Sequence, residues 1–239
     1  MSDFTDKLNA DIAPDLAELD SKLNTAPEKI QYEVVSELAA AGFPGLVVLA
    51  RYLRDRRGDA PTPVEGSIYQ TLFAAENGEI NDWLAAEFPG GVVAIPSDRG
   101  VDYAPLQDSL IRRDYQSADR LTLQKMCELA GPDAVKRKWL YFTEVDRAPI
   151  TDLQTLDRLW RIYSRGQFGF SVQRQIWLGA GKNWEKLWPK LGWKTDKNWT
   201  RYPGGFTWDT SAPRGHLPLT NQLRGVRVMA SLLSHPAWS

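Results

Sequence analysis

Apolar residues recur every three or four positions in short stretches of this chain, and glycine or proline ends each stretch within a few turns. Ile30, Val34 and Leu38 follow this spacing, and Gly42 supplies the stop. No stretch of residues 1–87 alternates apolar and polar side chains as a half-buried strand would. We therefore predict a small helical bundle over residues 1–87 and an all-α class for the whole chain.

A run rich in proline and glycine, residues 88–100, follows the predicted bundle. We predict an N-terminal helical bundle (1–87), a linker (88–100) and a mostly helical core domain with long aromatic loops (101–239). The charges divide in a similar way, since residues 1–90 hold 7 Lys and Arg against 16 Asp and Glu, and residues 91–239 hold 22 against 14. The acidic bundle is interpreted as a stabilising or docking module with a solvated surface.

The composition excludes several classes of protein. A single cysteine, Cys127, and two histidines leave little for a metal site or a disulfide. No apolar run approaches the about 20 residues of a membrane span, and the N-terminus lacks a secretion or transit signal. We expect a soluble, cytoplasmic monomer, with Cys127 buried and inert.

Caps and stops predict further helices in the second domain. Thr151-Asp152, Ser171 and Asn183 are each placed to begin a helix, and Gly131-Pro132 ends one. In the run Gly166-Gln167-Phe168-Gly169-Phe170 the glycines are expected to permit a tight turn with both phenylalanines pointing inward. Because this run follows a helix, it does not indicate a dinucleotide-binding loop.

The stretch 191–219 holds too much glycine and proline for regular structure, yet it is unusually aromatic. Eight of the ten tryptophans lie from Trp160 onward. A loop this long within a domain is more often functional than not, and its flat side chains suit a stacked ligand. The aromatic residues of this stretch are Trp193, Trp199, Tyr202, Phe206 and Trp208.

A last helix is predicted from Thr220 to about residue 234. Asn221, Arg224 and Arg227 recur on one face of it, and guanidinium groups suit carboxylates or phosphates. Together with the aromatic stretch they indicate a site for a flat apolar ring system with acidic substituents, although a solvated helix face would show the same spacing. The side chains expected to face the core are Leu223, Val226, Ala230 and Leu233.

The role of several other polar residues can be interpreted in two ways. His216 could be an axial metal ligand, but a lone histidine is more often a packed, hydrogen-bonded residue. Four acidic residues could pair for acid–base chemistry, although helix capping and solvation explain them more simply. These acidic residues are Glu144, Asp146, Asp152 and Asp157.

Three runs in order, DLQTLDRLW (152–160), GQFGFSVQ (166–173) and GHLP (215–218), resemble the genomes-uncoupled-four family of porphyrin-binding proteins. The resemblance covers about residues 100–238, and the N-terminal module is similar to that of cyanobacterial members. It implies a helical, cupped core that binds protoporphyrin IX and magnesium protoporphyrin IX. It also implies a non-enzymatic activator of magnesium chelatase in chlorophyll biosynthesis, acting through the large porphyrin-binding subunit, with no nucleic-acid partner. Peripheral membrane association is compatible with it, although no anchor in the sequence requires it.

The resemblance also assigns site residues. It places the porphyrin between two aromatic loops, with two arginines near the propionates and no covalent cofactor. Tyr202 stands where some members of the family carry tryptophan. The porphyrin-binding residues expected in this way are Phe142, Val145, Tyr202, Phe206, Asn221, Leu223, Arg224 and Arg227.

Two other functional classes remain compatible with the residues. Residues 158–239 carry 13 Lys and Arg against 3 Asp and Glu, and aromatics among cations can stack on unpaired bases. An enzyme that acts on a tetrapyrrole directly is the other class, and the two histidines argue against metal insertion by this chain alone.

Overall fold

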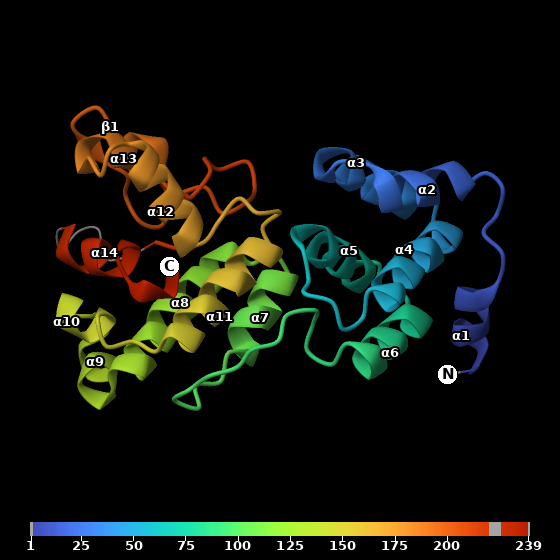
Figure 1. Cartoon of the computed structure of the whole chain (residues 1–239), viewed down its shortest axis with the longest axis horizontal. Coiled ribbons are helices and arrows are strands. Elements are labelled where there is room, and N and C mark those ends of the chain that lie inside the picture. The colour runs from blue at the N-terminus through green and yellow to red at the C-terminus, as the bar shows by residue number, and fades with distance from the viewer. Residues whose placement is uncertain (1, 220–225, 239) are drawn as a thin grey trace. The chain divides into compact units, whose positions relative to one another are not determined.

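The computed structural model describes residues 2–219 and 226–238, and these fold almost entirely into α-helices (Figure 1). The sheet found among them is a small antiparallel hairpin of β1 (Lys194–Thr195) and β2 (Asn198–Trp199). The predicted all-α class is confirmed. The chain divides into two compact units, Met1–Val92 and Val93–Ser239.

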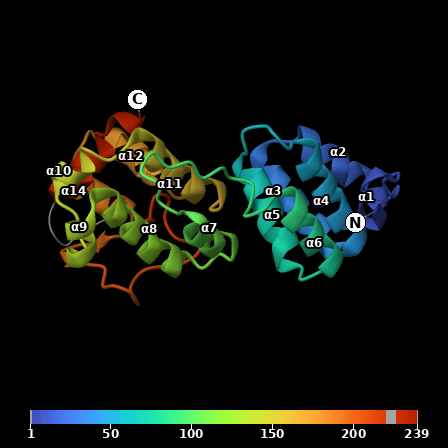
Figure 2. The same cartoon turned by 90° about the horizontal axis from the view of Figure 1, so that it is seen from below.

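The N-terminal unit packs its helices around fully buried leucine and isoleucine side chains, with α3, α4 and α5 side by side (Figure 2). Gly45 lets α4 approach α3 closely, because a β-carbon at this position would lie 1.9 Å from the Leu38 carbonyl oxygen. The helices of this unit are α1 (Ser2–Asn9), α2 (Ala17–Thr25), α3 (Glu28–Ala40), α4 (Phe43–Asp55), α5 (Pro63–Ala74) and α6 (Gly78–Glu87).

Local capping explains where two of these helices begin. The Thr62 backbone N–H donates to the Glu65 carboxylate at 2.8 Å, and the Thr62 hydroxyl accepts from the Val64 N–H, which forms the capping box of α5. The Asn77 side chain accepts the Ile80 N–H at 3.2 Å and caps α6. Asn77-Gly78 is therefore the start of a helix.

The C-terminal unit contains the remaining helices of the described residues. Its longest helices are α8 and α11. Trp160 on α11 is fully buried, and its indole N–H donates to the hydroxyl of Thr122 on α8 at 2.8 Å. The elements are α7 (Ala104–Ile111), α8 (Tyr115–Ala130), α9 (Pro132–Arg137), α10 (Phe142–Val145), α11 (Ile150–Ile162), α12 (Phe170–Gly179), α13 (Trp184–Lys190), α14 (Val226–Leu233) and the 3-10 helix η2 (Pro236–Trp238).

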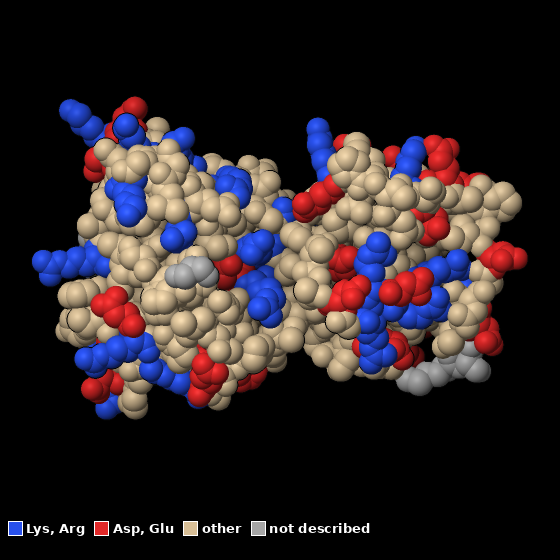
Figure 3. All heavy atoms as spheres, viewed as in Figure 1, with Lys and Arg blue, Asp and Glu red and all other residues tan. Residues whose placement is uncertain are grey.

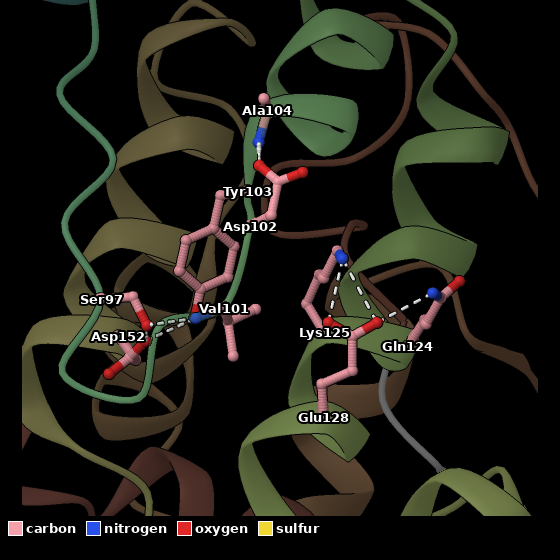
Figure 4. Close-up of polar contacts among 9 residues, drawn as sticks. All are labelled: Ser97, Val101, Asp102, Tyr103, Ala104, Gln124, Lys125, Glu128 and Asp152. Carbon is pink, nitrogen blue, oxygen red and sulfur yellow. Dashed lines mark hydrogen bonds and ion pairs between the residues drawn. The ribbon is translucent and has the colours of Figure 1, made fainter.

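Asp152 does not cap a helix and is not solvated, so both simple interpretations of it were wrong. It is fully buried on α11 and accepts hydrogen bonds from the hydroxyls of Ser97 and Tyr103 (Figure 4). The Asp98 N–H also donates to it, at 3.0 Å. The Ser97 hydroxyl also accepts the Val101 N–H at 2.9 Å. Asp152 therefore fastens the segment before α7 to α11. Burial and the neighbouring carboxylate raise the pKa of Tyr103, so its hydroxyl stays protonated as the donor.

The tight turn before α12 forms as predicted. Phe168 and Phe170 are fully buried, and Gly169 has a φ of 131°. A β-carbon at Gly169 would lie 2.7 Å from the Asp157 carboxylate, which accepts the Ser171 N–H and hydroxyl at 2.8 and 2.7 Å. Asp157 therefore caps α12, as the capping interpretation predicted, but it is buried and not solvated.

The last helix faces the core differently from the prediction. Val226 is 39% exposed and Ala230 is only half-buried, so the predicted stripe is wrong at these positions. Leu223 lies outside the described residues, and Leu233 is buried as expected. The buried side chains of α14 are Val228, Met229, Leu232 and Leu233.

None of the helices in residues 2–219 and 226–238 has the length and hydropathy needed to cross a membrane. The same residues do not bring three or more His, Cys, Asp or Glu side chains together in an arrangement that could hold a metal ion. Cys127 is buried, and burial raises the pKa of its thiol to about 11.

Candidate functional site

An aromatic ring and a cation from distant parts of the sequence meet on the surface of α10 and α14. The guanidinium of Arg227 lies over the Phe142 ring, 5.8 Å from its centroid, and both side chains are exposed. The Ser231 hydroxyl holds the two helices together, because it lies 3.0 Å from the Phe142 carbonyl oxygen and also contacts the Asp146 carboxylate. This surface offers a flat ring face beside a permanent positive charge.

A second aromatic group forms in the loop after β2. Tyr202, Phe206 and Trp208 pack against one another with ring centroids 5.8 to 6.4 Å apart. Tyr202 is 48% exposed, whereas Phe206 is buried. The Trp208 indole N–H donates to the Pro203 carbonyl oxygen at 3.1 Å and closes the loop on itself. The loop therefore presents Tyr202 to solvent from a packed base.

His216 supports this loop as a buried, hydrogen-bonded residue. Its Nε2 accepts the Thr207 N–H at 3.2 Å, so Nδ1 carries the proton and donates to the Leu191 carbonyl oxygen at 2.6 Å. Burial lowers the pKa of His216, which favours this neutral form. Both ring nitrogens are engaged, so the packed interpretation is confirmed and an axial metal ligand at this residue is not supported.

Most of the tryptophans near the aromatic stretch belong to the core and not to a surface. Trp177, Trp184, Trp188 and Trp193 stack in a column with successive centroids 5.1, 5.3 and 5.8 Å apart. Trp193 is fully buried, and its indole N–H donates to the His216 carbonyl oxygen at 2.8 Å. The expectation that Trp193 forms a ligand wall was therefore wrong.

Helix α14 joins the two aromatic groups. Its residues Met229 and Leu233 belong to the buried cluster that contains Phe206 and the stacked tryptophans, while its exposed side carries Arg227. Val145 lies on α10, a short helix and not a loop, and is buried. A shift of α14 would therefore move side chains in both aromatic groups.

A third aromatic and cationic group lies next to Phe142 in the sequence and was missed by the sequence analysis. The Arg137 guanidinium lies 4.6 Å from the centroid of the Tyr141 ring and 5.1 Å from that of Trp139. The Glu144 carboxylate contacts Arg137 at 2.7 Å and accepts the Tyr141 N–H at 2.8 Å. The alternation of these side chains at 137, 139 and 141 is the signal that could have indicated it.

Asp119 on α8 anchors the chain just before the segment expected to carry the arginine pair. Its carboxylate accepts the Leu219 N–H at 2.6 Å and is only 6% exposed. Burial raises the pKa of Asp119 to about 7, while the Leu219 hydrogen bond and Arg120 oppose the shift. No ion pair reaches this carboxyl group among the residues that the structure describes.

Comparison with protein families decides where this chain belongs. A family model described as GUN4-like matches residues 96–236, which is more than half of the chain. The chain belongs to the GUN4 family. A second model, described as an ARM-like repeat domain, GUN4-N terminal, matches residues 8–89. The family resemblance seen in the sequence is confirmed.

Curated relatives and solved structures agree with membership of the GUN4 family. The chain is 49% identical over 229 residues to the Ycf53-like protein of Synechocystis sp. (strain ATCC 27184 / PCC 6803 / Kazusa), covering 95% of this chain and 98% of the relative. It is 37% identical over 143 residues to the tetrapyrrole-binding protein, chloroplastic, of Arabidopsis thaliana, covering 56% and 54%.

Solved GUN4 structures match more than half of the chain. The structure of GUN4 from Chlamydomonas reinhardtii matches with a TM-score of 0.57 and 41% identity, covering 62% of this chain and 97% of that one. The ligand-free structure of Arabidopsis thaliana GUN4 matches with a TM-score of 0.53 and 38% identity, covering 57% and 97%.

In this GUN4-family chain, the predicted site residues fall into three groups. Phe142 and Arg227 lie together on the surface, and Tyr202 lies beside Phe206 in the aromatic loop. Val145 and Phe206 are buried beneath these surfaces. The remaining predicted residues, Asn221, Leu223 and Arg224, lie outside the described residues.

Proposed function

We propose that this chain is a non-enzymatic porphyrin-binding protein whose ligands are protoporphyrin IX and magnesium protoporphyrin IX. Membership of the GUN4 family supports this, as does the relative from Arabidopsis thaliana named as a tetrapyrrole-binding protein. The proposal includes activation of magnesium chelatase in chlorophyll biosynthesis through the large porphyrin-binding subunit of that enzyme. It also includes a monomeric protein in the cytoplasm of a cyanobacterial cell, with peripheral contact to photosynthetic membranes.

The observation that carries the proposal is the Arg227 guanidinium over the exposed Phe142 ring. A porphyrin is a flat apolar macrocycle with two carboxylate arms at one edge, so it needs an aromatic or aliphatic face and nearby cations. Phe142 offers the face, and Arg227 offers a planar cation that binds carboxylates in a forked geometry. Arg227 would exchange its contact with one ring for a contact with a propionate, without moving from its helix.

The proposed site extends to the other residues that the family resemblance assigns. Tyr202 presents a second exposed ring, and Phe206 supports it from below. Val145 is buried on α10, the helix that also carries Phe142. The proposal adds Asn221, Leu223 and Arg224 on the segment just before α14, with Arg224 as the second partner of the propionates.

The size of the ligand sets the affinity to expect. A porphyrin of about 42 heavy atoms, at roughly 0.3 kcal/mol per atom, has a ceiling near 12 kcal/mol of binding free energy. An open surface on short helices and loops falls short of that ceiling, because part of the macrocycle stays in water. Dissociation constants from about 0.1 to 10 μM are therefore expected.

The test is a fluorescence titration of the full chain with a water-soluble porphyrin, free and magnesium-loaded. Wild-type protein should show saturable one-site quenching, and Arg227→Ala should weaken binding by about 1 to 2 kcal/mol, or roughly 5- to 30-fold. Arg112→Ala is the matched control, because Arg112 is also exposed and lies just after α7 in an ion pair with Asp108.

Two results would contradict the proposal. Absence of saturable quenching in the wild type would refute porphyrin as the ligand. Equal losses of affinity in the Arg227 and Arg112 variants would refute the placement of the site at Arg227. If binding is found, chelatase turnover is measured next with and without this protein. Unchanged turnover would leave porphyrin binding intact and refute the activating role.

A further inference from the structure

A cavity of about 390 Å³ opens between α11, α12 and η2, and its lining shares no residue with the proposed porphyrin site. Arg158 and Arg161 reach it from α11, Arg174 from α12 and Trp238 from η2. The two helices α11 and α12 meet at the start of α12, where the Ser171 N–H donates to the Asp157 carboxylate of α11 at 2.8 Å. The volume falls within the range of about 300 to 1,000 Å³ that is typical of small-molecule sites.

The three arginines of this cavity keep most of their hydrogen-bonding capacity. Arg158 is exposed and makes no ion pair or hydrogen bond with any residue in 2–219 or 226–238. Arg161 lies 4.0 Å from the Asp157 carboxylate, too far for a hydrogen bond. Arg174 uses only its Nε, which donates to the Leu233 carbonyl oxygen at 3.1 Å and fixes the side chain.

The one carboxylate in the lining, Asp157, offsets only part of this positive charge. Asp157 is 5% exposed, and its two oxygens accept the N–H and the hydroxyl of Ser171 at 2.8 and 2.7 Å. Its charge is therefore directed at the first turn of α12. Three guanidinium groups against one carboxylate leave a surplus of two positive charges around the cavity.

We propose that this cavity binds a small, multiply charged anion, such as a di- or triphosphate or a tricarboxylate. Guanidinium groups are planar forks that match phosphate and carboxylate oxygens, and several around one cavity favour a ligand with several negative charges. The Trp238 ring adds an apolar wall that a single inorganic ion would not use. On the face drawn in Figure 3, the Lys and Arg side chains of residues 93–239 form separate patches and not one continuous basic surface.

Two glutamine side chains of the lining hydrogen-bond to neighbouring segments. Gln154 donates its side-chain amide to the Ala237 carbonyl oxygen at 3.1 Å, and Gln175 accepts from Arg214 at 2.7 Å. These bonds tie η2 and α12 to their neighbours. The arginines on α11 are then the groups free to move toward a ligand.

The test uses isothermal titration of the full chain with pyrophosphate and, separately, with citrate at low ionic strength. Arg158→Gln and Arg161→Gln should each weaken anion binding about tenfold, because each removes a charged donor. Arg112→Gln removes the same charge from an exposed position just after α7 and should leave binding unchanged. Arg174 is not substituted, because its bond to Leu233 also holds α12 to the end of α14.

Ionic strength provides a second readout. Binding should weaken as salt rises to about 1 M, where the screening length falls to about 3 Å. Thermal unfolding of each variant, followed by circular dichroism, shows whether it is folded. Two binding arms separate the sources of the anion, since a preference for pyrophosphate indicates a phosphorylated metabolite and a preference for citrate indicates a polycarboxylate.

Three results would overturn the proposal. The first is no heat of binding for either anion, and the second is equal weakening in the Arg112 variant. The third is binding of an acidic peptide such as oligoglutamate without binding of either small anion, which would make the cavity a protein interface. None of these results bears on the porphyrin site, which is tested separately through Arg227.

Discussion

The wild-type protein should lose stability as the pH rises towards neutrality, and replacing Asp119 by asparagine should remove that loss. The Asp119 carboxyl is 6% exposed and accepts a hydrogen bond from the Leu219 N–H at 2.6 Å. Burial raises its pKa from 3.8 to about 7. An asparagine side chain at this position would keep an oxygen for the Leu219 N–H and could not ionise.

The direction of the pH dependence follows from which state holds the proton. Between about pH 4 and 7 the folded protein keeps a proton on Asp119 that the unfolded chain has released. The free energy of unfolding therefore falls by about 1.4 kcal/mol per pH unit in this window. The stabilisation is fully present below the unfolded pKa and is lost as the pH rises through about 7, for a total on the order of 4 kcal/mol.

The assay is urea denaturation at a series of pH values from about 5 to 8, followed by tryptophan fluorescence. Eight of the ten tryptophans lie at or after Trp160, so the signal reports the unit that contains Asp119. The lowered pKa of His216 gives an opposing slope, because its contribution is lost as the pH falls. The quantity to compare is therefore the difference between wild type and Asp119→Asn at each pH.

Asp133→Asn is the matched control, because Asp133 is an exposed acidic residue of the same unit. Its effect should be small and should not change the slope. Parallel stability profiles of wild type and Asp119→Asn between about pH 5 and 7 would refute the reasoning.

Three further substitutions test the packing. Gly45→Ala should destabilise the N-terminal unit by about 3 kcal/mol in thermal unfolding, because its β-carbon would lie 1.9 Å from the Leu38 carbonyl oxygen; an unchanged midpoint would contradict this contact. Trp193→Phe should cost about 1 to 3 kcal/mol in urea denaturation, because the His216 carbonyl oxygen loses its buried donor. Ser231→Ala should weaken porphyrin binding about threefold by loosening α10 from α14, whereas unaltered binding would show that this hydroxyl does not position the site.

The ends of several helices were predictable because local residues set them. Asn77 and Asn183 cap α6 and α13 through hydrogen bonds to N–H groups three positions on, and that geometry needs no distant partner. Gly42 and Gly131 adopt positive φ angles at the ends of α3 and α8, where other residues would be strained. These signals act within one turn of helix and are visible in the sequence.

The buried side of α14 and the role of Asp152 could not be predicted in this way. From Val226 to Leu233 all positions except Arg227 and Ser231 are apolar, so spacing alone does not decide which of them faces the core. The partners of Asp152 lie about fifty positions earlier in the chain, at Ser97 and Tyr103. Only tertiary contacts settle both questions.

For the candidate site, the sequence supplied the residue types, and the family resemblance supplied their grouping. The spacing of arginines and the aromatic stretch favoured a flat anionic ligand, but they did not indicate that Phe142 meets Arg227. Aromatic content was a poor guide to exposure, because Trp193 and Phe206 are buried while Tyr202 is not. Side chains of this size serve a core as readily as a binding surface.

The column of stacked indoles couples the electronic transitions of four tryptophans. Trp177, Trp184, Trp188 and Trp193 lie with successive ring centroids less than 6 Å apart, close enough for their electronic transitions to interact. The electronic excitation produced when one ring absorbs light is then delocalised over its neighbours in the column. Removing Trp184 from the middle would change the near-ultraviolet spectra of its neighbours as well as deleting its own, so the spectra of single variants would not add up to that of the intact protein.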